Sequence, residues 1–299
     1  MLCRQPSLRA RPGFYNHLVQ PASPCDGIDV ILVSPRNPLN IGAVARAMAN
    51  FGLSRLTVIT PYDPSWRQAR SAIDAEHLLL NAHESPSLAA AVAHCTLVAG
   101  TATSRYRHPE QPHFFLPAFI AHAHQELAAH GHIAIVFGSE KFGLSREDLS
   151  LCNVIVEIPT HPRQPSMNLG QAVAVCLYAL TQQPSAIGPI SPASPSNQNP
   201  APEPSQPDEP EELIPAITPS ENDKTLTIPF PSTGLAAGDL NRVAELILET
   251  MQAARYSPAS MRLANQQDLR LMLRRWSLSN HDLRRALGLF RRILWKLHH

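Results

Sequence analysis

The 299-residue sequence predicts an α/β fold with a parallel sheet, then a disordered proline-rich linker and a small all-α C-terminal domain. Three observations support this prediction. Short apolar runs alternate with helical segments over residues 28–183, prolines gather in residues 184–232, and basic side chains gather in residues 233–299. Apolar strands that alternate with helices are typical of a parallel sheet covered on both faces.

The α/β region contains about five strand candidates. Short apolar runs, rich in β-branched residues, predict strands at residues 28–34, 56–60, 96–100, 133–138 and 154–159. The segments between them have helical spacing of apolar residues. We expect helices at about residues 41–51, 69–94, 116–129 and 169–180.

Residues 184–232 have the composition of a linker. Thirteen of the 29 prolines lie there, with seven acidic side chains and a single lysine. Such a stretch buries too little apolar surface to offset the entropy of ordering it, so we expect an extended, disordered segment. Residues 1–27 carry no interpretable motif, and we expect a disordered extension there as well.

Residues 233–299 carry eleven basic and five acidic side chains, a net charge of +6 that the linker hides in the total of +1. Apolar spacing predicts helices over residues 239–255 and 258–276 and a third helix after Ser279, a suitable N-cap. The third helix would place leucines on one side and arginines on the other. We expect a small helical bundle with a basic exterior.

Composition and cysteine usage exclude several classes of protein. A hydrophobic fraction of 44% is enough for a core, and no stretch reaches the ~18 consecutive apolar residues of a membrane span. The arginines of residues 1–27 are not followed by the apolar region of a secretory signal. Five widely spaced cysteines without a Cys-x-x-Cys pair indicate a reducing cytoplasm rather than disulfides or a zinc ribbon. The histidine pairs 122/124 and 130/132 are two residues apart and do not share a helix face, so we expect no metal site.

Four loops at the carboxyl ends of the expected strands have unusual sequences. Ligands of open α/β sheets bind at this edge. The loops cover residues 34–42, 100–105, 138–145 and 158–170. The third holds Glu140 between two glycines, and the prolines of the fourth lead to Ser166 and Asn168 at a helix start. The plainer interpretation is that the Asn and Ser residues are N-caps and that Glu140 pairs with a neighbouring cation.

Two common nucleotide-binding motifs are incomplete. Gly138 and Gly143 resemble part of a P-loop, but Leu144 stands where the phosphate-binding lysine is needed. No Gly-x-Gly-x-x-Gly follows the first strand. A nucleotide hydrolase and a standard dinucleotide-binding fold are both disfavoured.

Taken together, the loops carry three motifs in order. They read N-P-x-N-I-G-x-x-A-R-A from residue 37, F-G-x-E-x-x-G-L-S from residue 137, and I-P followed by S-x-N-L-x-x-A-V from residue 158. This set resembles the SPOUT-class ribose 2′-O-methyltransferases of the SpoU/TrmH type over about residues 28–182. The sequences L-R-L-M-L-R-R-W and D-L-R-R-A-L-G-L-F-R-R-I-L resemble the helical extension of the TrmJ branch, which methylates the tRNA anticodon loop.

The resemblance implies a C-terminal trefoil knot that binds S-adenosylmethionine, and a homodimer in which the first-motif arginine reaches the partner's cofactor site. It implies 2′-O-methylation of a ribose in tRNA, at a cytidine or uridine of the position-32 type. By motif position the catalytic set is Asn40, Arg46, Glu140, Ser166 and Asn168. The implied cofactor pocket consists of Thr101, Ala102, Thr103, Gly138, Ile158, Ser166, Met167 and Asn168, with Met167 in place of the usual leucine.

Basic residues are the candidates for RNA contact, because phosphate contacts supply most of the affinity. Near the site these are Arg36 and Arg105, and on the last helix they are Arg284, Arg285, Arg291 and Arg292. Three alternatives remain open: arginines that only solvate a bundle, a ribosomal RNA substrate, and a non-catalytic RNA-binding protein built on this fold.

Overall fold

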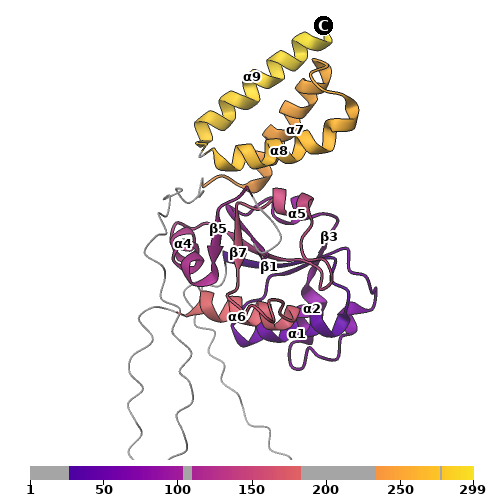
Figure 1. Ribbon diagram of the computed structural model, residues 1–299, viewed down its shortest axis with the longest axis vertical. Coiled ribbons are helices and arrows are strands. Elements are labelled where there is room, and N and C mark those ends of the chain that lie inside the picture. The colour runs from indigo at the N-terminus through magenta and orange to yellow at the C-terminus, as the bar shows by residue number, and fades with distance from the viewer. Residues whose placement is uncertain (1–26, 104–109, 183–233, 277) are drawn as a thin grey trace, which may run out of the picture.

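The computed structural model describes residues 27–103, 110–182, 234–276 and 278–299. The expected N-terminal extension up to residue 26, Arg105 and the expected linker over 184–232 lie outside the described residues. Figure 1 shows the α/β part with three further helices, α7 to α9, above it.

The sheet has seven strands in the order β3-β2-β1-β6-β4-β7-β5, and every adjacent pair is parallel. The strands are β1 (Ile28–Val33), β2 (Leu56–Ile59), β3 (His83–Ser85), β4 (Leu97–Thr101), β5 (His113–Phe115), β6 (Ile133–Phe137) and β7 (Val154–Glu157). In the interior strand β1, Val30 aligns with Leu56 on one side and Ile135 on the other. The predicted parallel sheet is confirmed.

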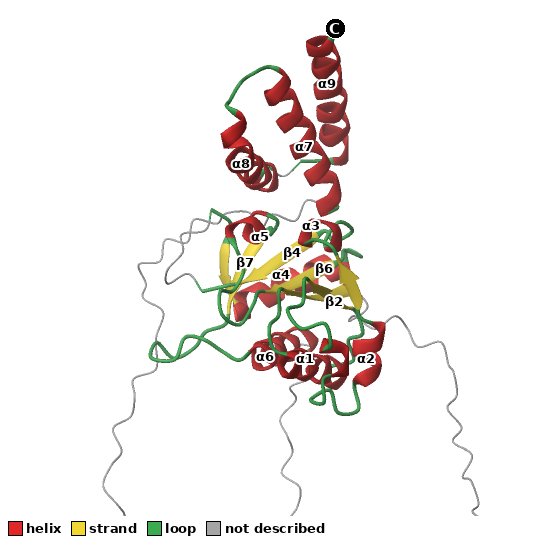
Figure 2. Ribbon diagram, turned by 90° about the vertical axis from the view of Figure 1, so that its right-hand side faces the viewer, coloured by secondary structure: helices red, strands yellow, loops and turns green. Residues whose placement is uncertain are grey.

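Helices cover both faces of the sheet (Figure 2). They are α1 (Pro38–Asn50), α2 (Glu76–Asn81), α3 (Leu88–Ala91), α4 (Leu116–Ala128), α5 (Arg146–Ser150) and α6 (Leu169–Thr181). All of β1 is buried, and its alternate residues pack into two hydrophobic cores, one on each face of the sheet. Ile28, Val30 and Leu32 pack with α1, α4 and α6. Ile31 and Val33 pack on the other face with α3 and α5.

The helical region expected over about residues 69–94 is interrupted by a strand. Two short helices, α2 and α3, lie there with β3 between them. The guanidinium of Arg67 donates to the carbonyls of Leu79 and Ala82, at 2.6 and 3.1 Å, which satisfies the free end of α2. Pro86 cannot continue a helix, and Ser87 starts α3 as its N-cap by accepting from the Ala90 amide at 3.2 Å.

The sheet also has two strands more than the five or so expected. Strands β3 and β5 are each three residues long and lie at the two edges of the sheet. Neither His83–Ser85 nor His113–Phe115 is long enough to show the alternation that identifies a strand. Pairing with a neighbouring strand therefore decided their conformation.

Three further helices, α7 (Ala237–Ala253), α8 (Arg262–Arg275) and α9 (Asn280–His298), pack around their own apolar cluster. The expected start of α9 is confirmed: Ser279 is its N-cap in a capping box with Asp282. The start of α7 is attached to the α/β part, where the amides of Ala237 and Gly238 donate to the carbonyls of Cys95 and Ala93 at 2.8 and 2.9 Å. Among the described helices, none combines the length and apolar character needed to cross a bilayer.

Two arginines of α8 are buried, Arg270 and Arg274, and Arg274 lies where α8 meets α7. Arg274 is only 2% exposed and donates to the Asn241 side chain at 3.1 Å and to the Arg270 carbonyl at 3.2 Å. Its burial lowers the pKa of the guanidinium to about 10. The packing of α8 therefore includes a desolvated charge, which is costly unless hydrogen bonds compensate it.

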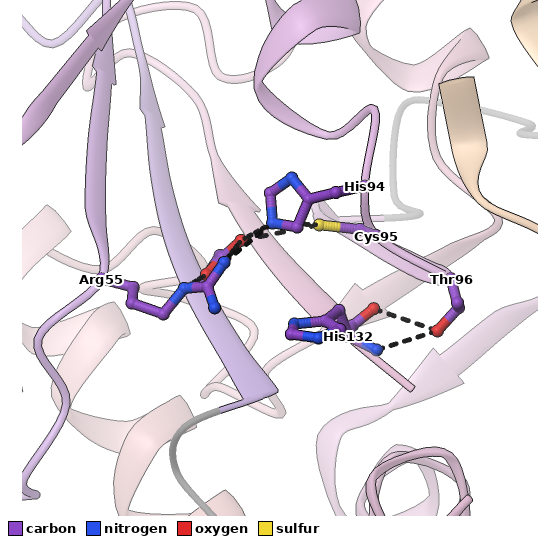
Figure 3. Close-up of polar contacts among 6 residues, drawn as sticks. Arg55, His94, Cys95, Thr96 and His132 are labelled. Atoms are coloured by element: carbon purple, nitrogen blue, oxygen red, sulfur yellow. Dashed lines mark hydrogen bonds and ion pairs between the residues drawn. The ribbon is translucent and has the colours of Figure 1, made fainter. Parts of the chain in front are cut away.

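A polar cluster lies at the amino-terminal edge of the sheet (Figure 3). Asp29 is 4% exposed and forms an ion pair with Nε of Arg55, while His94 Nε2 lies 2.6 Å from its second oxygen. The thiol of Cys95 lies 3.6 Å from the same oxygen, and burial, with the carboxylate adding to it, raises the pKa of this thiol. Donor atoms of Asp29, His94 and Cys95 lie within 4.8 Å of one another, as in a metal site. Because Arg55 already neutralises the carboxylate, we assign the cluster as an ion pair.

Replacing Arg55 by Met is expected to destabilise the fold, because the buried Asp29 carboxylate keeps only the His94 ring and the weak thiol donor of Cys95 as partners. The expected loss is about 1–3 kcal/mol in the free energy of unfolding, measured by urea denaturation at neutral pH. The control is the double variant Asp29→Leu/Arg55→Met, which removes both charges and should recover most of the loss. Equal stability of Arg55→Met and the unaltered protein would contradict the assignment.

Candidate active site

The loops that follow β1, β6 and β7 meet at the carboxyl-terminal edge of the sheet, and Glu140 joins the first two. One oxygen of its carboxylate accepts from the Arg36 amide at 2.8 Å. The other accepts from the Asn37 amide at 3.1 Å and from the Asn40 side chain at 2.8 Å. A single side chain thus holds the loop after β1 against the loop after β6.

The turn that carries Glu140 depends on two glycines. The Gly143 amide donates to the Ser139 carbonyl at 2.8 Å, which closes the loop as an isolated bridge. Gly143 has a φ of +65°, in the left-handed region, and a Cβ on Gly138 would lie 2.1 Å from the carbonyl carbon of Gly143. Any side chain at Gly138 would therefore push Glu140 away from its partners.

Asn168 connects the third loop to the same group. Its side-chain amide donates to Oδ1 of Asn40 at 2.9 Å, while its own Oδ1 caps α6 by accepting from the Gly170 amide at 2.9 Å. Both ends of the Asn168 amide are thereby oriented. For α1 the cap is Asn37, whose Oδ1 accepts from the Leu39 amide at 2.9 Å. Asn40 therefore does not cap α1, and its side chain instead connects the loops through its hydrogen bonds to Glu140 and Asn168.

The environment of Glu140 favours its charged form. Partial burial raises the pKa of this carboxyl, but the hydrogen bonds from the Asn40 side chain and from the Arg36 and Asn37 amides outweigh burial and hold the pKa below its usual 4.5. The connection between the loops is therefore made by a carboxylate, which is a stronger acceptor than a neutral acid.

A cavity of about 360 Å³ opens beside this group of residues. Its walls include most of the cofactor residues that motif position implies, namely Thr101, Ala102, Thr103, Gly138, Ile158, Ser166 and Met167. Asn168 is the exception: it bonds to Asn40 instead of lining the cavity. Ser166 and Glu140 both line the cavity, so a ligand that fills it is bounded by the hydroxyl and the carboxylate.

Sequence reasoning missed Glu157, which ends β7 and lines the cavity. Its carboxylate accepts from Thr103 Oγ1 at 3.1 Å and lies 2.8 Å from Nε2 of His113. The signal was present, since Glu157 is the charged residue in an otherwise apolar strand. His113 carried no comparable signal, because β5 itself was not recognised.

The arginines singled out by sequence occupy three places. Arg46 lies on the exposed side of α1 and makes no hydrogen bond or ion pair with any described residue, so it is not part of the Glu140 group. Arg36 lies at the edge of that group, with its guanidinium carbon 4.6 Å from the centre of the Tyr62 ring. The four arginines of α9 are all exposed, at positions 284, 285, 291 and 292.

The fold and the site together define the class of protein to which this chain belongs. A parallel α/β sheet carries a ligand cavity where three motif-bearing loops meet, and the sequence profile of the SpoU rRNA Methylase family matches residues 27–178, about half of the chain. The chain belongs to the SpoU rRNA methylase family.

Curated relatives match about the same share of the chain as the family profile does. The chain is 37% identical over 157 residues to the "tRNA (cytidine/uridine/adenosine-2'-O-)-methyltransferase TrmJ" of Pseudomonas aeruginosa, covering 51% of this chain and 60% of that protein. It is 35% identical over 155 residues to an "Uncharacterized tRNA/rRNA methyltransferase" of Haemophilus influenzae, covering 52% and 63%. The match therefore spans about three fifths of the length of these relatives.

A solved structure matches more of the chain. The crystal structure of TrmJ from Z. mobilis ZM4 superposes with a TM-score of 0.64 at 26% identity, and covers 89% of this chain and 98% of that one. This coverage extends the likeness beyond the residues that the family profile matches.

Replacing Glu140 by Gln is expected to loosen the loops, because the variant offers one neutral acceptor oxygen in place of two charged ones. The expected cost is about 1–2 kcal/mol in the free energy of unfolding at pH 7. Since the pKa of Glu140 is lower in the folded protein, this contribution is complete above pH 4.5 and is lost as the pH falls through the folded value.

The difference in unfolding free energy between the two proteins should therefore shrink in acid. Glu249→Gln, at an exposed site on α7, is the control and should show no such trend. A difference that stays constant from pH 7 to pH 3 would contradict the proposed connection.

Proposed function

We propose that this protein transfers the methyl group of S-adenosylmethionine to a ribose 2′-hydroxyl in tRNA, as a member of the TrmJ branch. The target we propose is a cytidine or uridine of the anticodon loop, of the position-32 type. The observation that carries the proposal is the Glu140–Asn40–Asn168 group, set beside a cavity in a chain of the SpoU family. The names of the curated relatives support the choice of tRNA over ribosomal RNA.

The residues of the cavity fit S-adenosylmethionine. Apolar walls from Ile158, Met167 and Leu169 suit the adenine ring, and the small residues at 101–103 let a ligand approach the backbone. Among the described residues, the lining holds two carboxylates, Glu140 and Glu157, and one cation, Lys141, a balance that favours a positively charged ligand. When bound, S-adenosylmethionine supplies a sulfonium methyl group that an oxygen nucleophile takes in a single displacement.

The chain contributes mainly by positioning. Asn40 and Asn168 are held by hydrogen bonds at both ends of their side chains, and Ser166 lies at the cavity wall. We propose that Ser166 or Asn168 orients the ribose hydroxyl toward the cavity. Orientation of this kind supplies up to about 7–11 kcal/mol of a barrier, with no metal and no covalent enzyme intermediate.

Arg46 is proposed to act on the developing alkoxide or the adjoining phosphate. A guanidinium stays protonated at physiological pH, so it is a poor proton acceptor and a good electrostatic partner. Because Arg46 is exposed and lies outside the Glu140 group of its own chain, we propose that it reaches the cofactor site of a partner in a homodimer.

The proposal extends to the architecture. We propose a SPOUT methyltransferase domain over residues 28–183 with the family's trefoil knot, and a basic RNA-binding domain over residues 233–299. Two observations support these assignments: β4 pairs with β6 and β7, out of chain order, and α7 to α9 have a separate apolar core. The buried, unpaired cysteines at positions 95, 152 and 176 support a cytoplasmic location.

The purified protein is expected to add a 2′-O-methyl group to one loop nucleotide of unmodified tRNA transcripts, mapped by mass spectrometry. Arg46→Ala should lower the rate at least about a hundredfold, as for loss of an oxyanion-stabilising donor, and leave RNA affinity unchanged. Absence of methylation by the unaltered protein, with S-adenosylmethionine binding undetected in calorimetry, would refute the function.

The matched variant Arg46→Lys tests the role of that residue. If its activity survives with a pH inflection shifted toward ~10.4, the pKa of lysine, residue 46 accepts the proton and the electrostatic role is wrong.

Changing Arg284, Arg285, Arg291 and Arg292 together to Gln is expected to weaken tRNA binding and flatten its dependence on salt. Each lost phosphate contact makes the negative slope of log K against log salt shallower by about 0.7–0.9, so the loss of four contacts should reduce its magnitude by up to about 3–4. All four side chains are exposed, so the fold should persist. The control is Arg242→Gln, an exposed arginine of α7 paired with Asp239. An unchanged slope would mean that these arginines only provide a polar surface exposed to water and do not contact RNA.

A further inference from the structure

Two exposed aromatic rings flank the Glu140 group on its solvent side. We propose that Phe142 and Tyr62 stack on unpaired RNA bases next to the methylated ribose, an inference that rests on the proposed function. We also propose that a second cavity beside Phe142 holds one of these bases. The proposal concerns recognition of the RNA and not the methyl transfer itself.

Phe142 lies in the turn that carries Glu140. It is 65% exposed, and its amide donates to the Ser139 hydroxyl at 3.3 Å, which holds its backbone. The Lys141 ammonium lies 5.1 Å from the ring centre. A single exposed apolar side chain is ordinary. An aromatic ring with a cation beside it, on a fixed turn at a proposed RNA site, is suited to stack on a base and contact its phosphate.

Tyr62 repeats this arrangement on the neighbouring loop. Its ring is 71% exposed, and the Arg36 guanidinium carbon lies 4.6 Å from the ring centre. The Tyr62 amide donates to the Pro35 carbonyl at 3.0 Å, and the Arg36 amide donates to Glu140 at 2.8 Å. Both aromatic–cation pairs are therefore attached to the group of residues where the ribose is proposed to bind.

The second cavity gives the Phe142 ring a place to hold a base. It has a volume of about 750 Å³, within the range of small-molecule sites. Phe142, Gly143 and Leu144 line both this cavity and the proposed cofactor cavity, so the turn separates the two. Its other walls include Ser34 and Arg146, which offer a hydroxyl and a cation.

This placement matches how single-stranded RNA is recognised. Bases in loops are splayed out and stacked on aromatic side chains, and stacking tolerates different sequences because every base has a flat face. A base that neighbours the target nucleotide lies one backbone unit from the ribose. When that ribose is at Asn40 and Glu140, the adjoining base is within reach of the turn at Phe142.

The test compares methylation of unmodified tRNA transcripts by the full chain, four variants of Phe142 and Tyr62, and one control variant. Phe142→Ala and Tyr62→Ala should each lower kcat/KM for tRNA about tenfold, mainly through KM, while Phe142→Trp and Tyr62→Phe should stay within about threefold. Affinity for S-adenosylmethionine, measured by calorimetry, should be unchanged in the Tyr62 variants. Because Phe142 also lines the proposed cofactor cavity, its variants are compared at saturating S-adenosylmethionine. Tyr178→Ala removes a ring that is 56% exposed on α6 and serves as the control.

A fluorescent RNA separates stacking from a structural effect. An anticodon stem–loop carrying 2-aminopurine next to the target nucleotide should be quenched by the unaltered protein and by Phe142→Trp, and much less by Phe142→Ala. Equal quenching and equal KM for Phe142→Ala would overturn the proposal, as would a change of oligomeric state in gel filtration, since the ring would then belong to an interface between copies. If the unaltered protein neither binds S-adenosylmethionine nor methylates RNA, the proposed function fails instead.

Discussion

The carboxylate of Glu140 is the contact on which the site depends. Its oxygens accept from two backbone amides of the loop after β1 and from the side-chain amide of Asn40 in α1, and Asn40 accepts in turn from Asn168. Segments about a hundred residues apart in the chain are thereby held in one arrangement. The hydrogen bonds keep the pKa of the group low, so the arrangement is stable wherever the carboxylate is charged.

One turn serves several purposes because of its two glycines. The close approach of Gly138 to Gly143 returns the chain over the end of β6 and directs Glu140 toward the loop after β1. The same return exposes the Phe142 ring and places the turn between two cavities. A substitution that opened this turn would alter the connection between loops, the cofactor cavity and the proposed stacking surface together.

Much of the fold is readable from the sequence because parallel strands that are buried on both faces are apolar throughout. The run Ile28–Val33 and the helices flanking it show this directly, and the capping box at Ser279 marks the start of α9. Strands β3 and β5 were not predicted from the sequence, because a segment of three residues is too short to show a periodic pattern. The expected helix over 69–94 failed because Pro86 and the Arg67 contacts interrupt an alanine-rich pattern that favours helix.

The motif residues Asn40, Glu140, Ser166 and Asn168 were identifiable from residue type and spacing, as was the edge of the sheet at which they lie. Their partners were not. That Asn37 caps α1 and leaves Asn40 for Glu140, that Asn168 faces Asn40 rather than the cavity, and that Glu157 joins Thr103 and His113 are facts of position in space. A hydrogen bond depends on a few ångströms between atoms of distant segments, and local sequence preferences contain no information about that distance.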